Sequence, residues 1–442
     1  MFKKLIENRI THIIIIALLA VILLVMLILF FMRNGALPSL GNTNMVFELA
    51  DETMAYSIDS PKLYTTKDTK GFFLATRDDI RFVTPDGKET RLGTYNLTAP
   101  ELVGKGDVVG VASNGGTTLH IFKPQGALYT VTTENPISFF SVTENAYAVV
   151  IARNGENYDI IVYNNKGKDI SYTLYAEPNI SPIAADVSSD GRILAVSYLD
   201  RNGGEINTKV TFSYTNKAEA ADFTAENGVF AAVTPDPDTI IGILRFMKGN
   251  TLIALSDRNL MCYEVGDKAV LKWSIDLGNK LSAICLSESD WFALAYGARN
   301  PNIPGEEPGV CRFYDLNGSA LGEYRVTGQI SQLTLGAGAA LVTGDRRLTA
   351  ISQNGNLLWT YDAPSDTLQA AFFENTNQIV LVGSAQTQIL RRVKLAPASA
   401  DPAASPIESA EPLDSAAPLE SAEPTDSAAP AESSAPTSTE EE

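Results

Sequence analysis

Histidine, cysteine and clustered positive charge are all scarce in this chain of 442 residues. There are two histidines, of which His12 lies at the edge of an apolar run near the N-terminus and His120 falls within a predicted strand. A Ser-His-Asp site needs a histidine placed beside its nucleophile, so this catalytic class is excluded. Zinc is disfavoured for the same reason, and no GxxxxGK[ST] phosphate loop occurs.

The three cysteines, Cys262, Cys285 and Cys311, lie within predicted strands and show no metal-ligand spacing. We expect them to be small buried apolar residues, with one disulfide as the alternative. There is no adjacent cysteine pair and no acidic calcium site with a tryptophan platform, which disfavours a quinone-dependent dehydrogenase. We therefore predict no cofactor and no metal.

The chain is acidic, with a formal net charge of −18. The segment after Leu395 holds 11 acidic residues and no Lys or Arg, which leaves −7 for the other residues. A chain with no basic cluster is a poor partner for nucleic acid or for anionic lipid headgroups, so no nucleic-acid partner is expected.

One long apolar run, Ile10–Met32, contains 23 residues without a charge. A bilayer core needs about 20, and a cleaved signal peptide has a shorter apolar core, so residues 10–32 are predicted to be a single uncleaved transmembrane helix in the lipid bilayer. Lys3, Lys4 and Arg9 precede the run, which predicts that residues 1–9 are cytoplasmic and that everything after a linker at 33–44 lies outside the cell membrane.

The stretch Leu348–Ala363, LTAISQNGNLLWTYDA, reads as two alternating strands around an Asn-Gly turn, which is a hairpin signal. Hairpins of this design recur at Ile80, Leu119, Ile160, Lys209, Leu260 and Cys311. A repeat with a period of roughly 40–50 residues is typical of a β-propeller.

Each repeat adds two further strands before its hairpin, so we name four strands A to D from the first to the last in each blade. Near-continuous apolar runs such as VVGVAS from Val108 and ILAVSY from Ile193 are typical of B strands buried on both faces. The predicted A strands are Lys62–Thr66, Pro100–Gly104, Ile137–Val142, Ile183–Val187, Ile240–Phe246, Leu281–Ser287, Ile330–Leu335 and Leu368–Glu374.

These eight sets predict an all-β, eight-bladed propeller over residues 45–395, with seven blades as the alternative. The eighth set has a C strand, Ile389–Leu395, and no D strand, whereas Met45–Leu49 is an unassigned strand at the start. Pairing these two segments would close the ring and remove an open sheet edge.

The hairpin residues Gly355, Leu357, Leu358 and Trp359 resemble the repeat of quinoprotein-type propellers, and SSDGRILAVSY from Ser188 resembles a WD40-like repeat. The combination of anchor, propeller and Ser/Pro tail is similar to membrane-anchored propeller proteins of unknown function from Gram-positive anaerobes. These resemblances imply the propeller fold and no particular activity.

The segment 396–442 is rich in Pro, Ser, Ala and Glu, and from Pro406 its prolines recur every six residues. Few large apolar residues and charge of one sign cannot offset the entropy of folding, so a disordered tail is predicted. It is either a solvated spacer or a stalk that contacts the cell wall.

Neighbouring strands of a blade alternate in direction, so the A–B and C–D turns share one end of the ring, here called the turn face. The B–C and D–A loops share the other end, the loop face. Turn-face connections are short and uniform, whereas loop-face connections such as GARNPNIPGEEPG from Gly297 vary in length, and variable loops on a rigid scaffold often carry function. The closing strand and the last C strand both place their outer ends on the turn face, so the loop face is expected to point away from the membrane.

Polar and aromatic residues of the loop face form the candidate binding site for a glycan or peptide. Asp236 and Asp238 suggest a calcium or acid–base site, although prolines between short acids are typical of a stiff solvated loop, and strand-end tyrosines are alternatively packing residues. The candidates are Arg153, Tyr158, Tyr198, Asp200, Arg201, Glu205, Asp236, Asp238, Tyr296 and Arg299.

With no catalytic motif, the chain is expected to be a non-enzymatic binding or scaffold module for a protein or a cell-wall polymer. The alternative is a carboxylate-dependent glycosidase or lyase on the loop face, which two carboxylates about 5–10 Å apart in a concave site would favour. A spacer or sensor ectodomain is a third reading.

Overall fold

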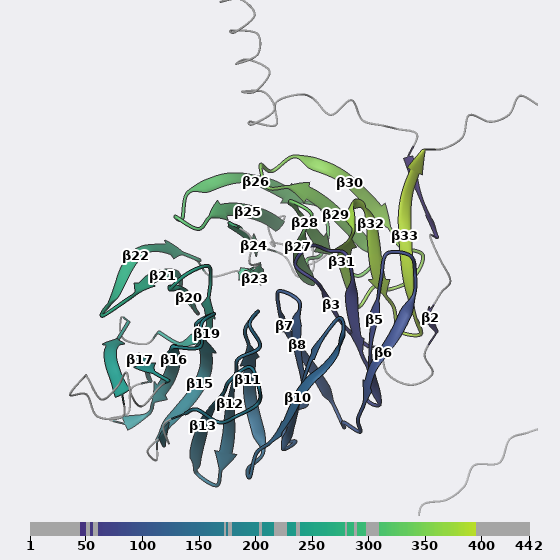
Figure 1. Ribbon diagram of the computed structural model, residues 1–442. Coiled ribbons are helices and arrows are strands. Elements are labelled where there is room, and N and C mark those ends of the chain that lie inside the picture. The colour runs from purple at the N-terminus through teal and green to yellow at the C-terminus, as the bar shows by residue number, and fades with distance from the viewer. Residues whose placement is uncertain are drawn as a thin grey trace, which may run out of the picture. The chain divides into compact units, whose positions relative to one another are not determined.

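Eight antiparallel sheets follow one another along the chain and form a ring, as the computed structural model shows (Figure 1). The structure describes residues 45–49, 54–55, 61–171, 174–175, 179–202, 206–215, 228–235, 239–278, 281–286, 290–297 and 309–394. Eight blades, and not seven, are therefore present, and the predicted all-β class is confirmed.

Each blade is four consecutive strands, except that the last is completed by the first strand of the chain. Blade 1 consists of β3 Lys62–Thr65, β4 Phe72–Ala75, β5 Asp79–Val83 and β6 Glu89–Thr94, and blade 2 of β7 Pro100–Lys105, β8 Val108–Ser113, β9 Thr118–Lys123 and β10 Gly126–Thr132. Blade 3 consists of β11 Ile137–Val142, β12 Ala148–Asn154, β13 Asn157–Tyr163 and β14 Leu174–Tyr175, and blade 4 of β15 Ile180–Val187, β16 Ile193–Asp200, β17 Asn207–Tyr214 and β18 Val229–Val233. Blade 5 consists of β19 Ile241–Phe246, β20 Thr251–Ser256, β21 Asn259–Val265 and β22 Ala269–Asp276, and blade 6 of β23 Leu281–Cys285, β24 Trp291–Tyr296, β25 Gly309–Asp315 and β26 Ala320–Val326. Blade 7 consists of β27 Gln332–Gly336, β28 Ala339–Thr343, β29 Arg347–Ser352 and β30 Leu357–Asp362. Blade 8 consists of β31 Gln369–Phe373, β32 Asn375–Val382, β33 Gln386–Lys394 and β1 Met45–Leu49, and β2 Met54–Ala55 also pairs with β33.

The closing strand lies where the sequence predicted it. β1 pairs antiparallel with β33, in a register that sets Met45 opposite Lys394 and Leu49 opposite Leu390. Phe47 packs against Trp359 and Tyr361 of blade 7, with ring centroids 4.8 Å apart in both pairs. The first strand of the described chain therefore completes blade 8 and also holds that blade against its neighbour.

The apolar core is divided into eight clusters, one at each interface between neighbouring blades. All six residues of the B strand β8 are buried, because a sheet on each side covers both of its faces. On the outer strand β30, by contrast, only Trp359 is buried, since the outer edge of the blade faces solvent. Burial thus falls from the inner to the outer strands of a blade.

A repeated contact explains the turn glycine and outer-strand aromatic of the hairpin motif. Trp359 donates its Nε1–H to the carbonyl oxygen of Thr376 in the next blade at 2.7 Å, and Trp273 donates likewise to Leu316 at 2.9 Å. Gly355 has a φ of 80°, and a Cβ atom there would lie 2.4 Å from the carbonyl oxygen of Glu323 in the preceding blade. Glycine is required at this position because of its positive φ and because a side chain would collide with the preceding blade. The motif therefore forms contacts between neighbouring blades.

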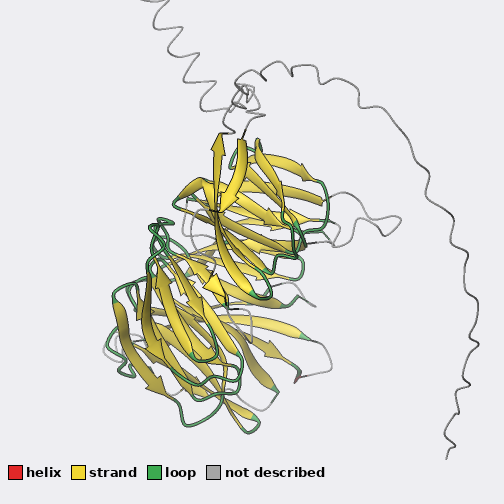
Figure 2. Ribbon diagram, turned by 90° about the vertical axis from the view of Figure 1, so that its right-hand side faces the viewer, coloured by secondary structure: helices red, strands yellow, loops and turns green. Residues whose placement is uncertain are grey.

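The described residues are strands joined by turns and loops (Figure 2). Within these residues there is no helix of the length and hydrophobicity that a membrane span requires. The predicted span at 10–32 lies outside the described residues, as do the predicted cytoplasmic end, the linker and the tail at 396–442.

Candidate functional site

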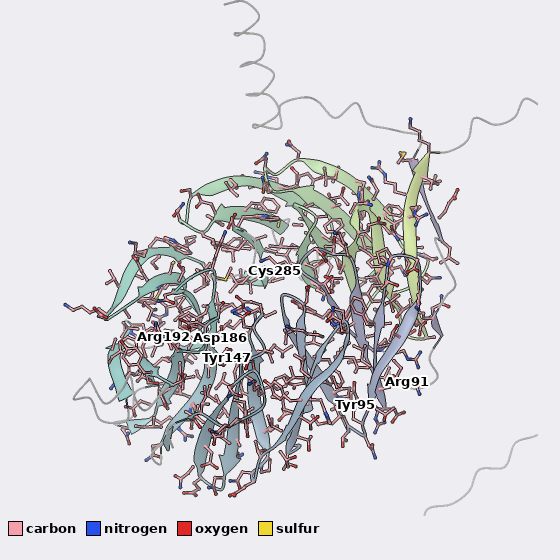
Figure 3. The ribbon with its side chains drawn as sticks, in the orientation of Figure 1. Arg91, Tyr95, Tyr147, Asp186, Arg192 and Cys285 are labelled. Carbon is pink, nitrogen blue, oxygen red and sulfur yellow. The ribbon has the colours of Figure 1, made fainter. Side chains whose placement is uncertain are left out.

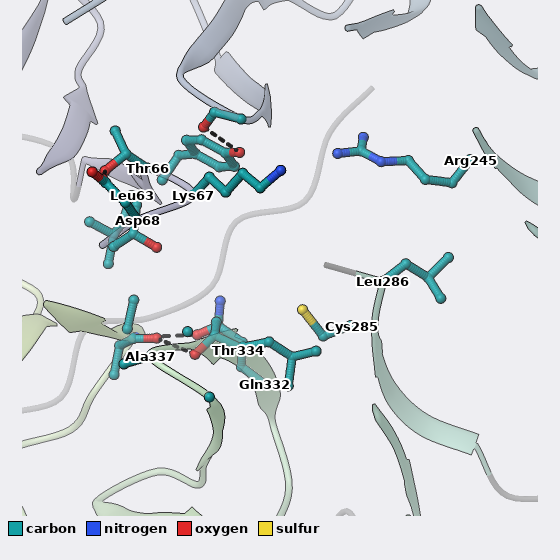
Figure 4. Close-up of a pocket in the computed structure, with 18 residues that line it drawn as sticks. Leu63, Thr66, Lys67, Asp68, Arg245, Cys285, Leu286, Gln332, Thr334 and Ala337 are labelled. Atoms are coloured by element: carbon teal, nitrogen blue, oxygen red, sulfur yellow. Dashed lines mark hydrogen bonds between the residues drawn. The ribbon is translucent and has the colours of Figure 1, made fainter. Parts of the chain in front are cut away.

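A cavity of about 420 Å³ lies among the innermost strands, at the end of the ring that carries the A–B turns. Its walls come from β3, β27 and β31, from the ends of β19 and β23, and from a residue beside the end of β7 (Figure 4). Because A strands run toward the turn face, the cavity belongs to that face and lies at the opposite end of the strands from the loop-face candidates.

A reciprocal pair of hydrogen bonds joins blade 2 to blade 5 beside this cavity. Lys105, at the end of β7 in blade 2, donates from Nζ to the carbonyl oxygen of Phe246 in blade 5 at 2.7 Å. Arg245 of blade 5 donates from its guanidinium to the carbonyl oxygen of Gly104 in blade 2 at 2.9 Å. Blades 2 and 5 are not neighbours in the ring, so these two bonds, which we call the cross-brace, link two sheets that share no strand pairing.

Two carboxylates balance the buried lysine of the cross-brace. The side chain of Lys105 is 2% exposed, and its Nζ lies 3.6 Å from Glu144 and 4.0 Å from Asp186. Asp186, on the inner side of the ring in Figure 3, is fully buried and accepts hydrogen bonds from the Ser141 hydroxyl at 2.8 Å and the Phe246 N–H at 2.7 Å. A buried charge is tolerable only when it is paired and hydrogen-bonded in this way, so the group joins blades 2, 3, 4 and 5.

Glu144 makes stability depend on pH. Burial raises its pKa, but the hydroxyl of Ser189 and the positive charge of Lys105 outweigh burial, so the pKa of Glu144 is below its ordinary 4.5. A carboxyl group whose pKa is lower in the folded than in the unfolded protein stabilises the fold at pH values above its unfolded-state pKa. This contribution is lost as the pH falls through its folded-state pKa.

We therefore expect Glu144→Gln to reduce the denaturant midpoint of the full chain above pH 5. The difference from the unchanged chain should shrink as the pH falls below 4.5, and it should be modest because the side chain is 35% exposed. Unfolding curves at pH 3.5, 5 and 7 measure it. A difference that grows on acidification would contradict this assignment.

Three charged residues are found among the described residues that line the cavity. Lys67, Asp68 and Arg245 are the charged residues among those that line it. Asp68 is engaged within its turn, where its Oδ1 accepts from the Thr66 hydroxyl and the Lys70 N–H, both at 3.0 Å. The described part of the lining therefore offers no pair of carboxylates.

Cys285 also lines the cavity, and its sulfur points into it (Figure 4). Burial raises the pKa of the Cys285 thiol to about 11, against smaller lowering effects of the Leu335 backbone and of Arg245. The thiol is therefore protonated near neutral pH and is a poor nucleophile. All three cysteines are free; Cys262 and Cys311 are buried as expected, whereas Cys285 is partly exposed.

The sequence-predicted site residues on the loop face form no single cluster. Arg153 and Tyr158 face each other in the β12–β13 hairpin of blade 3. Tyr158 packs with Tyr198 of blade 4 on one apolar cluster, which fits the alternative that strand-end tyrosines are packing residues. Burial raises the pKa of Tyr198 to about 12.

The other described candidates are held locally. Asp200 accepts the N–H of Asn202 at 2.8 Å, and the Arg201 guanidinium donates to the Ser181 hydroxyl at 3.1 Å. Tyr296, in blade 6, lies under the Arg312 guanidinium, 5.1 Å from the ring centroid. The remaining candidates, Glu205, Asp236, Asp238 and Arg299, lie outside the described residues.

Sequence reasoning missed the residues that shape the turn-face end of the channel. Lys105 ends the apolar run LVG in its innermost strand, and Asp186 interrupts the apolar stretch AADV in another. A charged residue in a strand predicted to be buried is a recognisable signal, because such a residue needs a partner. Within the described parts of the chain, no group of three or more His, Cys, Asp or Glu residues could hold a metal ion.

The sequence profile of a family of unknown function (DUF5711) matches residues 53–391. No curated protein matches the chain. Among solved structures, Sqt1 from Chaetomium thermophilum is similar, with a TM-score of 0.50 and 11% identity over 76% of this chain and 97% of Sqt1. BamB from Moraxella catarrhalis gives a TM-score of 0.45 and 12% identity over 78% and 100% of the two chains. Apo AztD from Citrobacter koseri gives 0.46 and 12% over 73% and 96%. At such identities the likeness concerns the fold alone.

Proposed function

This chain belongs to the DUF5711 family of unknown function, and from its ring geometry we propose that it is a membrane-anchored, extracytoplasmic propeller that binds a protein or a cell-wall polymer without catalysis. The observation that carries the proposal is the register of the closing strand. Met45 lies opposite Lys394, so the propeller begins and ends at the same corner of the turn face. If residues 10–32 span the bilayer, that corner is tethered and the loop face is presented to partners.

The surroundings of Asp68 in the cavity and of Asp200 on the loop face support a binding role over the glycosidase or lyase alternative. Hydrolysis by two carboxylates needs a pair that faces the substrate. In the cavity the carboxylate of Asp68 is held by its own turn, and on the loop face Asp200 accepts the backbone N–H of Asn202. Neither arrangement provides a pair for that chemistry.

Two single-cysteine labelling variants of the full chain test the proposal in cells. Arg153→Cys places a thiol on the loop face, and Asn317→Cys places a matched exposed thiol in a C–D turn on the turn face. A membrane-impermeant maleimide should label both on intact cells, and a maleimide–benzophenone crosslinker should capture protein or wall polymer more from residue 153 than from residue 317. The unchanged chain gives the background from its native cysteines.

Protection of both thiols in intact cells would contradict the extracytoplasmic placement. Capture from residue 317 alone would contradict presentation of the loop face.

A further inference from the structure

We infer that the outer rim of blades 5, 6 and 7 rests on the surface of the lipid bilayer at the turn face. The inference rests on the membrane anchor of the proposed function and adds a second contact with the same bilayer. It starts from five apolar side chains with exposed fractions between 36% and 52%, which we call the apolar rim. They are Val270, Leu271, Leu321, Leu357 and Leu358.

The apolar rim follows from an irregularity that recurs in the outer strands of these blades. In β30 the pairing register skips Leu358, and both Leu357 and Leu358 are exposed beside the buried Trp359. In β26 the register skips Leu321, and in β22 a register shift follows Leu271 directly. A β-bulge of this kind redirects a side chain of the outer strand. Each strand therefore presents apolar side chains to solvent just after its C–D turn.

The three strands form one continuous stretch of the ring. β22, β26 and β30 follow one another along its outer side and lead toward β33 (Figure 1). Trp273 of β22 donates to the carbonyl oxygen of Leu316, beside the blade 6 turn, at 2.9 Å. A Cβ atom on Gly322 of β26 would lie 2.4 Å from the carbonyl carbon of Asn354 in the blade 7 turn. Each outer strand therefore touches the turn of the next blade, and the apolar side chains follow one another along the same edge.

The apolar rim begins beside the point at which the chain enters the propeller. Phe47, two residues after Met45, packs against Trp359, which directly follows Leu358 in β30. Residues 33–44 separate the proposed membrane span from Met45. An extended chain covers at most about 3.6 Å per residue, so Met45 stays within about 40 Å of the bilayer. This tether makes the contact between the apolar rim and the bilayer intramolecular, so a weak attraction is sufficient to hold it.

Four charged side chains beside the apolar rim are paired with one another. Lys272 lies 2.7 Å from Glu264, and Arg312 lies 3.4 Å from Glu323. The blade 7 turn at 353–356, Gln-Asn-Gly-Asn, carries no charge. Such a surface fits lipid headgroups of zero net charge, such as phosphatidylcholine, because the attraction comes from buried apolar area.

The test uses the full chain in phosphatidylcholine nanodiscs that contain a nitroxide-labelled lipid, which quenches nearby fluorophores. Asn356→Cys places a fluorescent label in the blade 7 turn directly before Leu357, and Asn165→Cys places it in the C–D turn of blade 3, on the opposite side of the ring. Relative to discs without nitroxide, quenching should be at least about twofold stronger at residue 356, because interfacial apolar side chains lie about 5–10 Å into the boundary between headgroups and acyl chains. The unchanged chain gives the background from its native cysteines.

Substitutions within the apolar rim should remove this difference. Leu321→Gln combined with Leu358→Gln should reduce quenching of the blade 7 label to the level of the blade 3 label. The matched control combines Leu128→Gln with Leu368→Gln, which replace two exposed leucines outside the apolar rim, and should leave quenching unchanged. All four side chains are exposed, so the thermal midpoint should be the same in both variants.

Equal quenching of the two labels in discs that retain the chain would overturn the inference and leave the anchor in place. A chain that does not remain in the discs would overturn the anchor, and the bilayer contact with it. Crosslinking of residue 356 to a second copy of the chain, without quenching, would assign the apolar rim to self-association and would also overturn the inference.

Discussion

Replacing Lys105 with methionine is expected to lower the free energy of unfolding by about 3–5 kcal/mol, the usual cost of removing one partner from a buried ion pair. The variant leaves the carboxylate of Asp186, which is fully buried, without its positive neighbour. It also removes the donor to the carbonyl oxygen of Phe246, and so one half of the cross-brace between blades 2 and 5. Denaturant unfolding of the full chain at pH 7 measures the loss.

Two companion variants separate charge burial from the general effect of losing a lysine. Lys272→Met breaks an exposed ion pair with Glu264 at 2.7 Å and should change stability little, because solvent screens that pair. Adding Asp186→Asn to Lys105→Met should recover part of the loss, since no uncompensated charge then remains. A loss in Lys105→Met no larger than in Lys272→Met would show that the cross-brace does not stabilise the ring.

Deleting Met45–Leu49 is expected to lower the free energy of unfolding by at least about 4 kcal/mol, because it removes a ladder of hydrogen bonds worth about 0.5–1.5 kcal/mol each and the ring contacts of Phe47. The deletion also exposes one edge of β33, and exposed edges pair with other chains. We therefore expect a lower thermal midpoint together with concentration-dependent aggregation. Calorimetry measures the first and light scattering the second.

Point variants within this strand distinguish side-chain packing from ring closure. Phe47→Ala should lose about 2 kcal/mol, less than a fully buried phenylalanine, because Phe47 is half-buried. Leu49→Ala should be close to neutral, since Leu49 is 51% exposed. An unchanged thermal midpoint in the deletion variant would mean that the ring is stable without its first strand.

Most of the ring follows from local patterns. The predicted A strand at Ile137–Val142 has the bounds of β11. The pairing of Met45–Leu49 with the last blade is also confirmed. It was predictable because the last blade lacked one strand and the first strand had no partner. Most differences lie at strand ends, but the last strand of blade 4, β18, is formed by Val229–Val233, beyond the hairpin predicted from Lys209. β15 begins at Ile180, three residues before the predicted Ile183, because a register shift between Pro182 and Ala184 lets the pairing continue past the proline.

The cavity could not be predicted in the same way. Lys105 and Phe246 are 141 positions apart, and the bond between them depends on how the blades are angled around the ring, which no local pattern encodes. Loop length directed attention to the loop face, whereas the described cavity depends on innermost strand ends with short turns. Charged residues inside apolar A strands were the available signal.

The placement of Met45 beside Lys394 has a mechanical consequence. Tension applied between these two residues would pull β1 and β33 apart from one end of their ladder, so their hydrogen bonds would break one after another, as in a zipper. Sequential rupture needs less force than shearing all the bonds together. Stretching the protein by its ends would therefore open blade 8 first, while blades 2 to 5, bound to one another through Lys105 and Arg245, would yield later.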